Sequence, residues 1–210
     1  MISCEAVGGK SNAIIPVACS MEILHKASLI HDDLIDEDNL RRGHETFHKR
    51  FGSKKAVIMG DLMVSIAFEN IIRHRQKIKD PIQQKRYDAC LYSIISTFRR
   101  LATGELAEEV LKTKTEVCET EIEEIIYNKT AVLIEQCFRA GAILGNGSKS
   151  EVNMLSCFGK NVGLAFQTIN DINNIDGMEK KIKKTFATDL FQKKKNLTPV
   201  SYTHLTLPTN

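Results

Sequence analysis

The chain has 210 residues, a formal net charge of +3, 42% hydrophobic residues and 26% charged residues. These values fit one globular domain of average soluble composition, and they exclude a wholly disordered chain, a collagen-like chain and a disulfide scaffold. The charge is too small to favour a nucleic-acid-binding protein.

Six cysteines are spread along the chain without any Cys-x-x-Cys pair. A zinc site or a redox dithiol is therefore not expected, and scattered thiols fit a reducing compartment, so we expect a cytoplasmic protein. No run of 18 apolar residues occurs, and Glu5 and Lys10 interrupt the N-terminal segment. Neither a membrane-spanning helix nor a signal peptide is expected.

The first half of the chain predicts helices joined by polar connections. Pro16 is well placed to begin a helix that runs toward a group of acidic residues near position 32. Residues 39–54 are polar and contain two glycines, which predicts a loop. Apolar residues recur with helical spacing over 57–71, and the polar stretch 76–88 predicts a second connection.

The second half continues the helical pattern. Residues 89–111 and 121–144 each carry an apolar stripe with helical spacing, and Gly145-Asn146-Gly147 is expected to end the second of them. A last helix is predicted over about 151–176. Because no strand-like alternation appears, the predicted fold class is all-α, as a helical bundle.

An acidic cluster carries the first functional signal. Asp32 and Asp36 are one helical turn apart on the same face, and His25 lies two turns before Asp32. Two carboxylates this close repel each other unless a cation lies between them, and oxygen ligands of this kind suit Mg²⁺. A solvated acidic helix end is the other explanation.

Basic residues follow the acidic cluster. Arg41-Arg42-Gly43 comes five residues after Asp36, and guanidinium groups suit phosphate oxygens. A surface pair that neutralises nearby acids is the alternative. A lysine-rich stretch at 180–195 lies far downstream. One short acidic cluster with separated basic groups fits a metal ion and a small polyanionic ligand.

Two later helices place polar groups where a core is expected. Lys129 falls on the apolar stripe of 121–144, which is costly unless the ammonium is paired or lies along the edge of the stripe. Over 166–174, the residues Gln167, Asn170, Asp171 and Asn174 share one helix face. That face predicts either a polar cavity or an ordinary solvent-exposed surface.

Together these segments resemble the trans-isoprenyl diphosphate synthases, the polyprenyl synthetase family. The resemblance is carried by ordered motifs over residues 1 to about 200: His25–Asp36 with its Asp-Asp-x-x-Asp sequence, Arg41-Arg42-Gly43, Gly60-Asp61, Lys129-Thr130, Phe166-Gln167 and the basic stretch near Lys194. It implies an all-α bundle of the isoprenoid synthase type around a deep apolar cavity. It also implies a prenyltransferase that condenses isopentenyl diphosphate with an allylic diphosphate, and a homodimer or heteromer.

The resemblance further implies a role for individual residues. Mg²⁺ would be held by Asp32, Asp36 and Asp171. The allylic diphosphate would contact Arg41, Lys129, Lys184 and Lys194, with Thr130 beside Lys129. Isopentenyl diphosphate would contact His25 and Arg42, and Gln167 would complete the carbocation side with Asp171.

The sequence departs from the family pattern in three places. The second acidic motif usually begins Asp-Asp, whereas here it begins Asn170-Asp171, so one Mg²⁺ should be held less well. The family's Gly-Gly-Lys-x-x-Arg-Pro motif is absent, because no Arg-Pro follows Gly8-Gly9-Lys10. Residues 201–210 resemble an unrelated polar tail. The expectation is a catalytic region over 1–200 from the central part of a longer enzyme.

Two other functions fit part of this pattern. A non-catalytic partner subunit of a heteromeric prenyl synthase would account for Asn170 and for the missing motif. A class I terpene cyclase also pairs two such motifs, but Arg41-Arg42-Gly43 argues against it. For the synthase, the small side chains of Ala27 and Ser28 before Asp32 predict an open cavity floor and a medium- or long-chain product.

Overall fold

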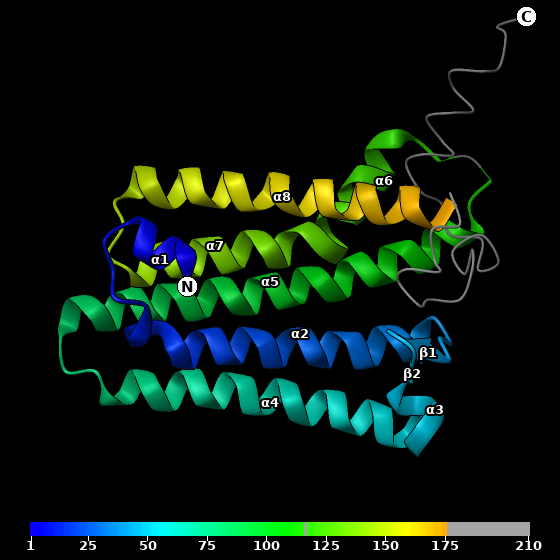
Figure 1. Cartoon of the computed structure of the whole chain (residues 1–210), viewed down its shortest axis with the longest axis horizontal. Helices are drawn as coiled ribbons and strands as arrows, with labels where there is room; N and C mark the ends of the chain where they lie inside the picture. Colours follow the sequence, from blue (N-terminus) through cyan, green and yellow to red (C-terminus); the bar gives the residue numbers. More distant parts are fainter. Residues whose placement is uncertain (116, 176–210) are drawn as a thin grey trace, which may run out of the picture.

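The computed structural model describes residues 1–115 and 117–175, and that part of the chain is almost entirely helical. Figure 1 shows long helices lying side by side along the long axis of the molecule, with α8 at one edge and α4 at the other. The long helices are α2 (Ile15–Ile35), α4 (Ser53–Lys77), α5 (Pro81–Thr113), α7 (Val132–Leu144) and α8 (Lys149–Ile175). The predicted all-α bundle is confirmed.

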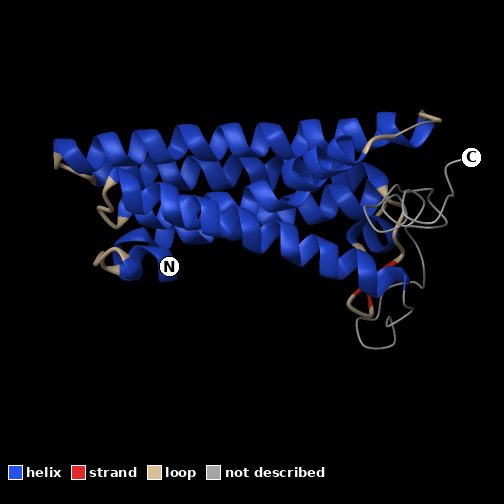
Figure 2. Cartoon of the chain, turned by 90° about the horizontal axis from the view of Figure 1, so that it is seen from above, coloured by secondary structure: helices blue, strands red, loops and turns tan. Residues whose placement is uncertain are grey.

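Shorter elements make up the rest of the secondary structure in the described residues. They are α1 (Ile2–Ala6), the 3₁₀ turn η1 (Ser11–Ile14), the strands β1 (Leu40–Arg41) and β2 (His44–Glu45), α3 (Phe47–Phe51), α6 (Glu119–Ile126) and the π-helical segment η2 (Tyr127–Ala131). Figure 2 shows that the two strands lie at one end of the bundle, in a molecule that is otherwise helical where it is described.

The predicted connection at 76–88 is wrong over most of its length. Helix α4 continues to Lys77, and α5 begins at Pro81. The Asp80 carboxylate accepts hydrogen bonds from the backbone N–H groups of Ile82 and Gln83, which caps α5, and Pro81 needs no such partner. The polar residues after Pro81 therefore belong to an exposed helix face.

The predicted loop at 39–54 is wrong in part, because it contains a small hairpin, the short helix α3 and the first residues of α4. Leu40 pairs with Glu45, and Arg41 pairs with His44. The two residues between them, Arg42 and Gly43, have φ values of +53° and +80°. Two successive positive φ angles give the tight turn that joins two antiparallel strands, and this turn explains the glycine after the arginine pair. The hairpin holds Arg41 over the end of α2.

The predicted helix over 121–144 is interrupted. It consists of α6, the π-helical η2 and α7. A π-helix widens the turn by one residue, and no apolar spacing in the sequence distinguishes it from an α-helix. Its position matters because Lys129 and Thr130 lie within it.

The main core lies between α1, α2, α4, α5 and α7. Among its fully buried side chains are Leu24, Ile71, Cys90 and Ile94. A second, smaller core forms around Leu111, Ile122 and Ile126.

Helix α2 is apolar enough to raise the question of a membrane. The segment Ser11–Ile35 has a mean hydropathy of 1.4 in its most apolar 18-residue window, so by length and composition alone it could cross one. Our sequence-based expectation that nothing spans a membrane considered only uninterrupted apolar runs and missed this segment. The core helix of a soluble protein and a signal sequence near the N-terminus pass the same test, so one such helix among the described residues is weak evidence for a membrane span.

Candidate active site at the mouth of an apolar cavity

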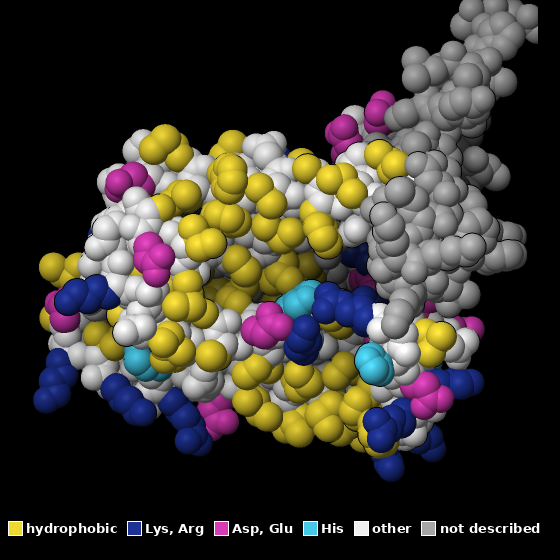
Figure 3. Space-filling view, viewed as in Figure 1, with side chains coloured by type: hydrophobic (Ala, Val, Ile, Leu, Met, Phe, Trp, Pro, Cys, Tyr) yellow, Lys and Arg dark blue, Asp and Glu magenta, His cyan; other side chains and the backbone are white. Residues whose placement is uncertain are grey.

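A cavity of about 1030 Å³ runs along the bundle between α2, α5, α7 and α8. This volume lies at the upper end of the range for small-molecule sites. Its lining extends along α2 from Asp36 to Ile14 and along α7 to Leu144. At a rise of 1.5 Å per residue, the α2 wall is roughly 30 Å long. Figure 3 shows the opening as a hollow in a hydrophobic surface, with charged side chains and histidine along one edge.

The acidic end of α2 lies at the mouth of this cavity. Both Asp32 and Asp36 line it, and Asp36 is only 6% exposed. The guanidinium of Arg41 donates to Asp32 Oδ2 at 3.0 Å and to Asp33 Oδ1 at 2.5 Å. Burial raises the pKa of Asp33, and the adjacent guanidinium partly offsets that effect. The hairpin therefore places Arg41, one of the predicted diphosphate-binding residues, in contact with the acidic motif.

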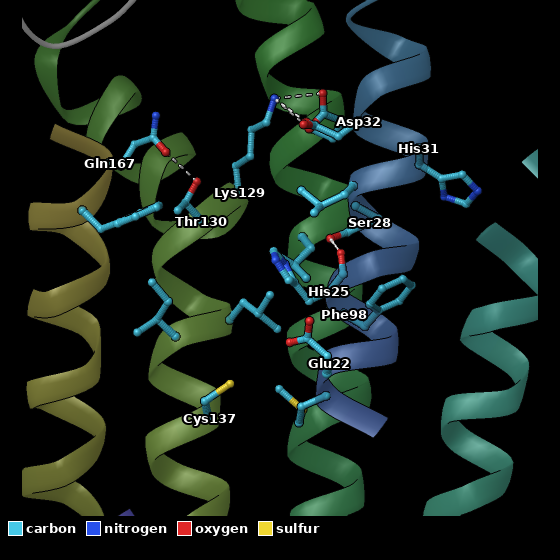
Figure 4. Close-up of a pocket in the computed structure, with 18 of the residues that line it drawn as sticks. Glu22, His25, Ser28, His31, Asp32, Phe98, Lys129, Thr130, Cys137 and Gln167 are labelled. Carbon is cyan, nitrogen blue, oxygen red and sulfur yellow. Dashed lines mark hydrogen bonds and ion pairs between the residues drawn. The ribbon is translucent and has the colours of Figure 1, made fainter. Parts of the chain in front are cut away.

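The ammonium of Lys129 approaches the same aspartate from the other side. Lys129 Nζ lies 3.4 Å from Asp32 Oδ1, 3.0 Å from Glu105 Oε2 and 2.5 Å from Glu108 Oε2. Figure 4 shows the side chain reaching across the cavity from η2 to α2. Burial alone would lower the pKa of Lys129, but the surrounding carboxylates raise it well above its usual range. The ammonium is held charged.

Glu105 and Glu108 are site residues that the sequence reasoning missed. They lie three residues apart on α5, and their side chains are 18% and 13% exposed. Burial raises the pKa of Glu105, with Lys129 acting in the opposite direction. The available signal was this glutamate pair next to an apolar stripe that includes Leu101 and Leu106. Such a pair also fits an ordinary exposed helix face.

Helix α8 supplies the opposite wall of the cavity. Thr130 donates from Oγ1 to Gln167 Oε1 at 3.1 Å, and Gln167 and Asn170 both line the cavity. The structure thus brings these residues to the same cavity as Asp32. The side chain of Asp171 and all of Lys184 and Lys194 fall outside the described residues, so their predicted roles stay predictions.

The remaining predicted residues lie along α2 and the hairpin. His25, Ser28 and Arg42 line the cavity, and Figure 4 shows His25 and Ser28 below Asp32. Ala27 is fully buried and does not line it. Of the two positions expected to control product length, only Ser28 therefore faces the cavity.

Comparison with known proteins identifies the family of this chain. The sequence matches the family described as Polyprenyl synthetase over residues 1–206. The chain belongs to the polyprenyl synthetase family. It is 34% identical, over 94% of its length, to a short chain isoprenyl diphosphate synthase of Methanothermobacter thermautotrophicus, of which it spans 58%.

Solved structures in the polyprenyl synthetase family share the fold. A geranylgeranyl pyrophosphate synthetase from Pyrococcus horikoshii superposes with a TM-score of 0.87 at 32% identity, covering 98% of this chain and 61% of that one. A polyprenyl synthase from Caulobacter crescentus, complexed with calcium and isoprenyl diphosphate, gives 0.84 at 25% identity over 96% and 59%. The chain thus spans about three fifths of the length of these relatives.

The carboxylates at the mouth of the cavity suit a divalent cation, although few of them converge. Among residues 1–115 and 117–175, no group of three His, Cys, Asp or Glu side chains is arranged to hold a metal ion. Asp32 and Asp36 provide two carboxylates, and Mg²⁺ commonly takes one or two together with water and substrate phosphate oxygens. The Lys129 ammonium lies 3.4 Å from Asp32 Oδ1, so a metal ion bound here would share this carboxylate with the lysine. The donor set fits Mg²⁺ that arrives with a phosphate ligand.

His25 gives a pH-dependent prediction. Burial lowers its pKa, so the folded protein binds fewer protons at this side chain than the unfolded chain does. The stability contribution is therefore complete above the unfolded pKa of about 6.5 and decreases as the pH falls through the folded pKa. We expect His25→Gln to make the free energy of unfolding fall less between pH 7.5 and 5.5, by under about 1 kcal/mol, since the side chain is half-buried.

Urea unfolding at the two pH values checks this expectation. His44→Gln removes an imidazole at an exposed position of β2 and is the matched control. Equal pH dependence in the His25→Gln variant and the wild type would contradict it.

Proposed function

We propose that this site binds an allylic diphosphate together with Mg²⁺ and transfers its prenyl group to isopentenyl diphosphate. The observation that carries the proposal is Asp32, held between Arg41 and Lys129 at the mouth of the long apolar cavity. The charged mouth suits the diphosphate group of such a substrate, and the apolar cavity suits its hydrocarbon tail. The relatives named for isoprenyl and geranylgeranyl diphosphates support the same substrate class.

The chain's own residues account for most of the chemistry. When the allylic C–O bond breaks, the diphosphate leaves with the electron pair, and Arg41 and Lys129 can stabilise its growing negative charge. Bound Mg²⁺, held by Asp32, Asp36 and the predicted Asp171, would supply further positive charge to the same oxygens.

The new bond forms when the isopentenyl double bond attacks the allylic cation. A proton then leaves the adduct for a diphosphate oxygen, which restores a double bond. Gln167 and Thr130 present oxygen dipoles near this position, and His25 with Arg42 lies where the second diphosphate would bind. The apolar walls exclude water that would otherwise capture the cation. The length of the cavity favours a medium- or long-chain product.

Incubation with Mg²⁺, labelled isopentenyl diphosphate and geranyl diphosphate tests the proposal. Label should pass into an apolar, acid-labile product, and Asp32→Asn should abolish the transfer. Absence of both label transfer and Mg²⁺-dependent binding of geranyl diphosphate would contradict the proposed function.

Asn170 favours a second candidate function. This neutral amide lines the cavity where the family pattern has a carboxylate, which weakens the metal site. A non-catalytic partner subunit of a heteromeric prenyl synthase would keep the cavity and bind prenyl diphosphates without turning them over. Binding of geranyl diphosphate without label transfer would favour this alternative.

Asn170→Asp is therefore expected to lower the Mg²⁺ requirement. A carboxylate at this position restores an anionic oxygen ligand, so half-maximal binding of geranyl diphosphate should need several-fold less Mg²⁺. A Mg²⁺ titration at fixed geranyl diphosphate measures this. Asn161→Asp, on an exposed turn of the same helix, is the control and should leave the requirement unchanged. An unchanged requirement in Asn170→Asp would remove this position from the metal site.

A further inference from the structure

The π-helical segment η2 carries Lys129 and Thr130, and the backbones of two helices approach it closely. π-Helical turns are rare, and they are found frequently at functional sites. One of the two neighbours is α5, which approaches η2 at Gly104, and the other is α8, which approaches it at Gly163.

Both contacts are possible only without a side chain. A Cβ at Gly104 would lie 2.9 Å from the backbone N of Lys129 and 3.0 Å from the carbonyl carbon of Asn128. A Cβ at Gly163 would lie 2.5 Å from Ala131 Cα and 3.1 Å from its carbonyl oxygen. Backbone atoms cannot rotate aside as a side chain does, so a larger residue would push the helix away from η2.

Each glycine is followed one turn later by a polar side chain that binds the same segment. Four residues after Gly104, Glu108 contacts the Lys129 ammonium. Four residues after Gly163, Gln167 accepts from the Thr130 hydroxyl. Positions four apart share a helix face, so each helix combines a close backbone approach with a side-chain contact.

We infer that Gly104 and Gly163 are positioning residues, which hold η2 so that Lys129 reaches Asp32 and Thr130 stays at Gln167. The contact from Lys129 to Asp32 is 3.4 Å, the longest of the three carboxylate contacts of this lysine. It is also the contact that joins Lys129 to α2, whereas Glu105 and Glu108 both lie on α5. The effect on ligand binding rests on the proposed function, whereas the geometry does not.

Gly104→Ala and Gly163→Ala test the inference, with Gly159→Ala as the matched control. Gly159 lies one turn earlier on α8, where a Cβ would come 2.9 Å from Phe138 Cδ2 and 3.0 Å from the Cα of Glu135, both in α7 and not in η2. All three variants should lower the denaturant midpoint, because each adds a methyl group to a tight contact. Circular dichroism shows which variants fold. If Gly163→Ala does not fold, the comparison of Gly104→Ala with Gly159→Ala tests the inference.

The first readout is acetylation of Lys129 by an amine-reactive ester, followed by mass spectrometry. An ammonium held by three carboxylates reacts slowly, so we expect Lys129 to react about tenfold faster in Gly104→Ala and Gly163→Ala and at the wild-type rate in Gly159→Ala. Adding Ala131→Gly to Gly163→Ala removes one of the clashing atoms and should restore part of the protection. Equal labelling of Lys129 in Gly163→Ala and Gly159→Ala would overturn the inference.

The second readout is calorimetric binding of inorganic pyrophosphate with Mg²⁺. Affinity should fall at least about tenfold in Gly104→Ala and Gly163→Ala, and should stay at the wild-type value in Gly159→Ala. A similar loss in Gly159→Ala would mean a general stability effect and would overturn the inference. If labelling changes as expected but no form of the protein binds pyrophosphate, the positioning role stands and the proposed function fails.

Discussion

Replacing Lys129 with methionine is expected to lower the free energy of unfolding by about 3 kcal/mol at neutral pH. The substitution leaves Asp32, Glu105 and Glu108 close together without the ammonium that lies among them. Removing one partner of a buried ionic group costs about 3–5 kcal/mol, and the partial exposure of these carboxylates places the effect at the lower end. Urea unfolding measures it.

A second lysine supplies the control for this prediction. Lys112→Met removes an i, i+3 ion pair with Glu109, whose side chain is 46% exposed, and should cost under about 1 kcal/mol because a single carboxylate open to solvent is left unpaired. In Lys129→Met, the ammonium no longer opposes the effect of burial, so the pKa of Glu105 rises further. The folded variant then binds a proton at Glu105 more readily than its unfolded chain does. Its stability deficit should therefore shrink as the pH falls toward about 5. Equal losses in the two lysine variants would contradict the central place of Lys129.

The substitution Ser28→Phe is expected to shorten the product of the proposed reaction. Ser28 lines the cavity one turn before Asp32, so a phenyl ring there would enter the space below the diphosphate. Chromatography of the dephosphorylated alcohols gives the product lengths. An unchanged product would show that the growing chain does not pass this position.

Ala27→Phe is the control at the neighbouring position. Ala27 is fully buried and does not line the cavity, so a phenyl ring should overpack the core and cost about 1–3 kcal/mol without shortening the product. Ala67 of α4 is fully buried too and does not line the cavity either. The lining instead continues to Ile14, Gly141 and Leu144, which supports the longer product.

The acidic motif and its basic partners were predictable because their signals are local. Carboxylates at i and i+4 on an apolar helix, and a lysine on an apolar stripe, conflict with simple burial and so indicate a site. The structure places Asp32, Asp36 and Lys129 together at the mouth of the predicted cavity. The hairpin that brings Arg41 to Asp32 was not predicted, because two-residue strands leave no alternating pattern.

Other features depend on tertiary contacts that no local pattern encodes. Adjacent positions such as Ala27 and Ser28 differ by about 100° around a helix, and only the packing of α2 decides which one faces the cavity. Glu105 resembles an exposed surface residue until η2 is placed over α5. The glycines at 104 and 163 resemble weak points of two helices, and their small size matters only against the backbone of η2.

Calorimetric titration of the protein with geranyl diphosphate, in Mg²⁺ and then in EDTA, tests the central claim most directly. If Asp32 and Asp36 hold the cation that binds the diphosphate, one molecule should bind in Mg²⁺ and binding should disappear in EDTA. Asp32→Asn should weaken the Mg²⁺-dependent binding at least about tenfold. Equal affinity with and without Mg²⁺, or wild-type affinity in Asp32→Asn, would contradict the account.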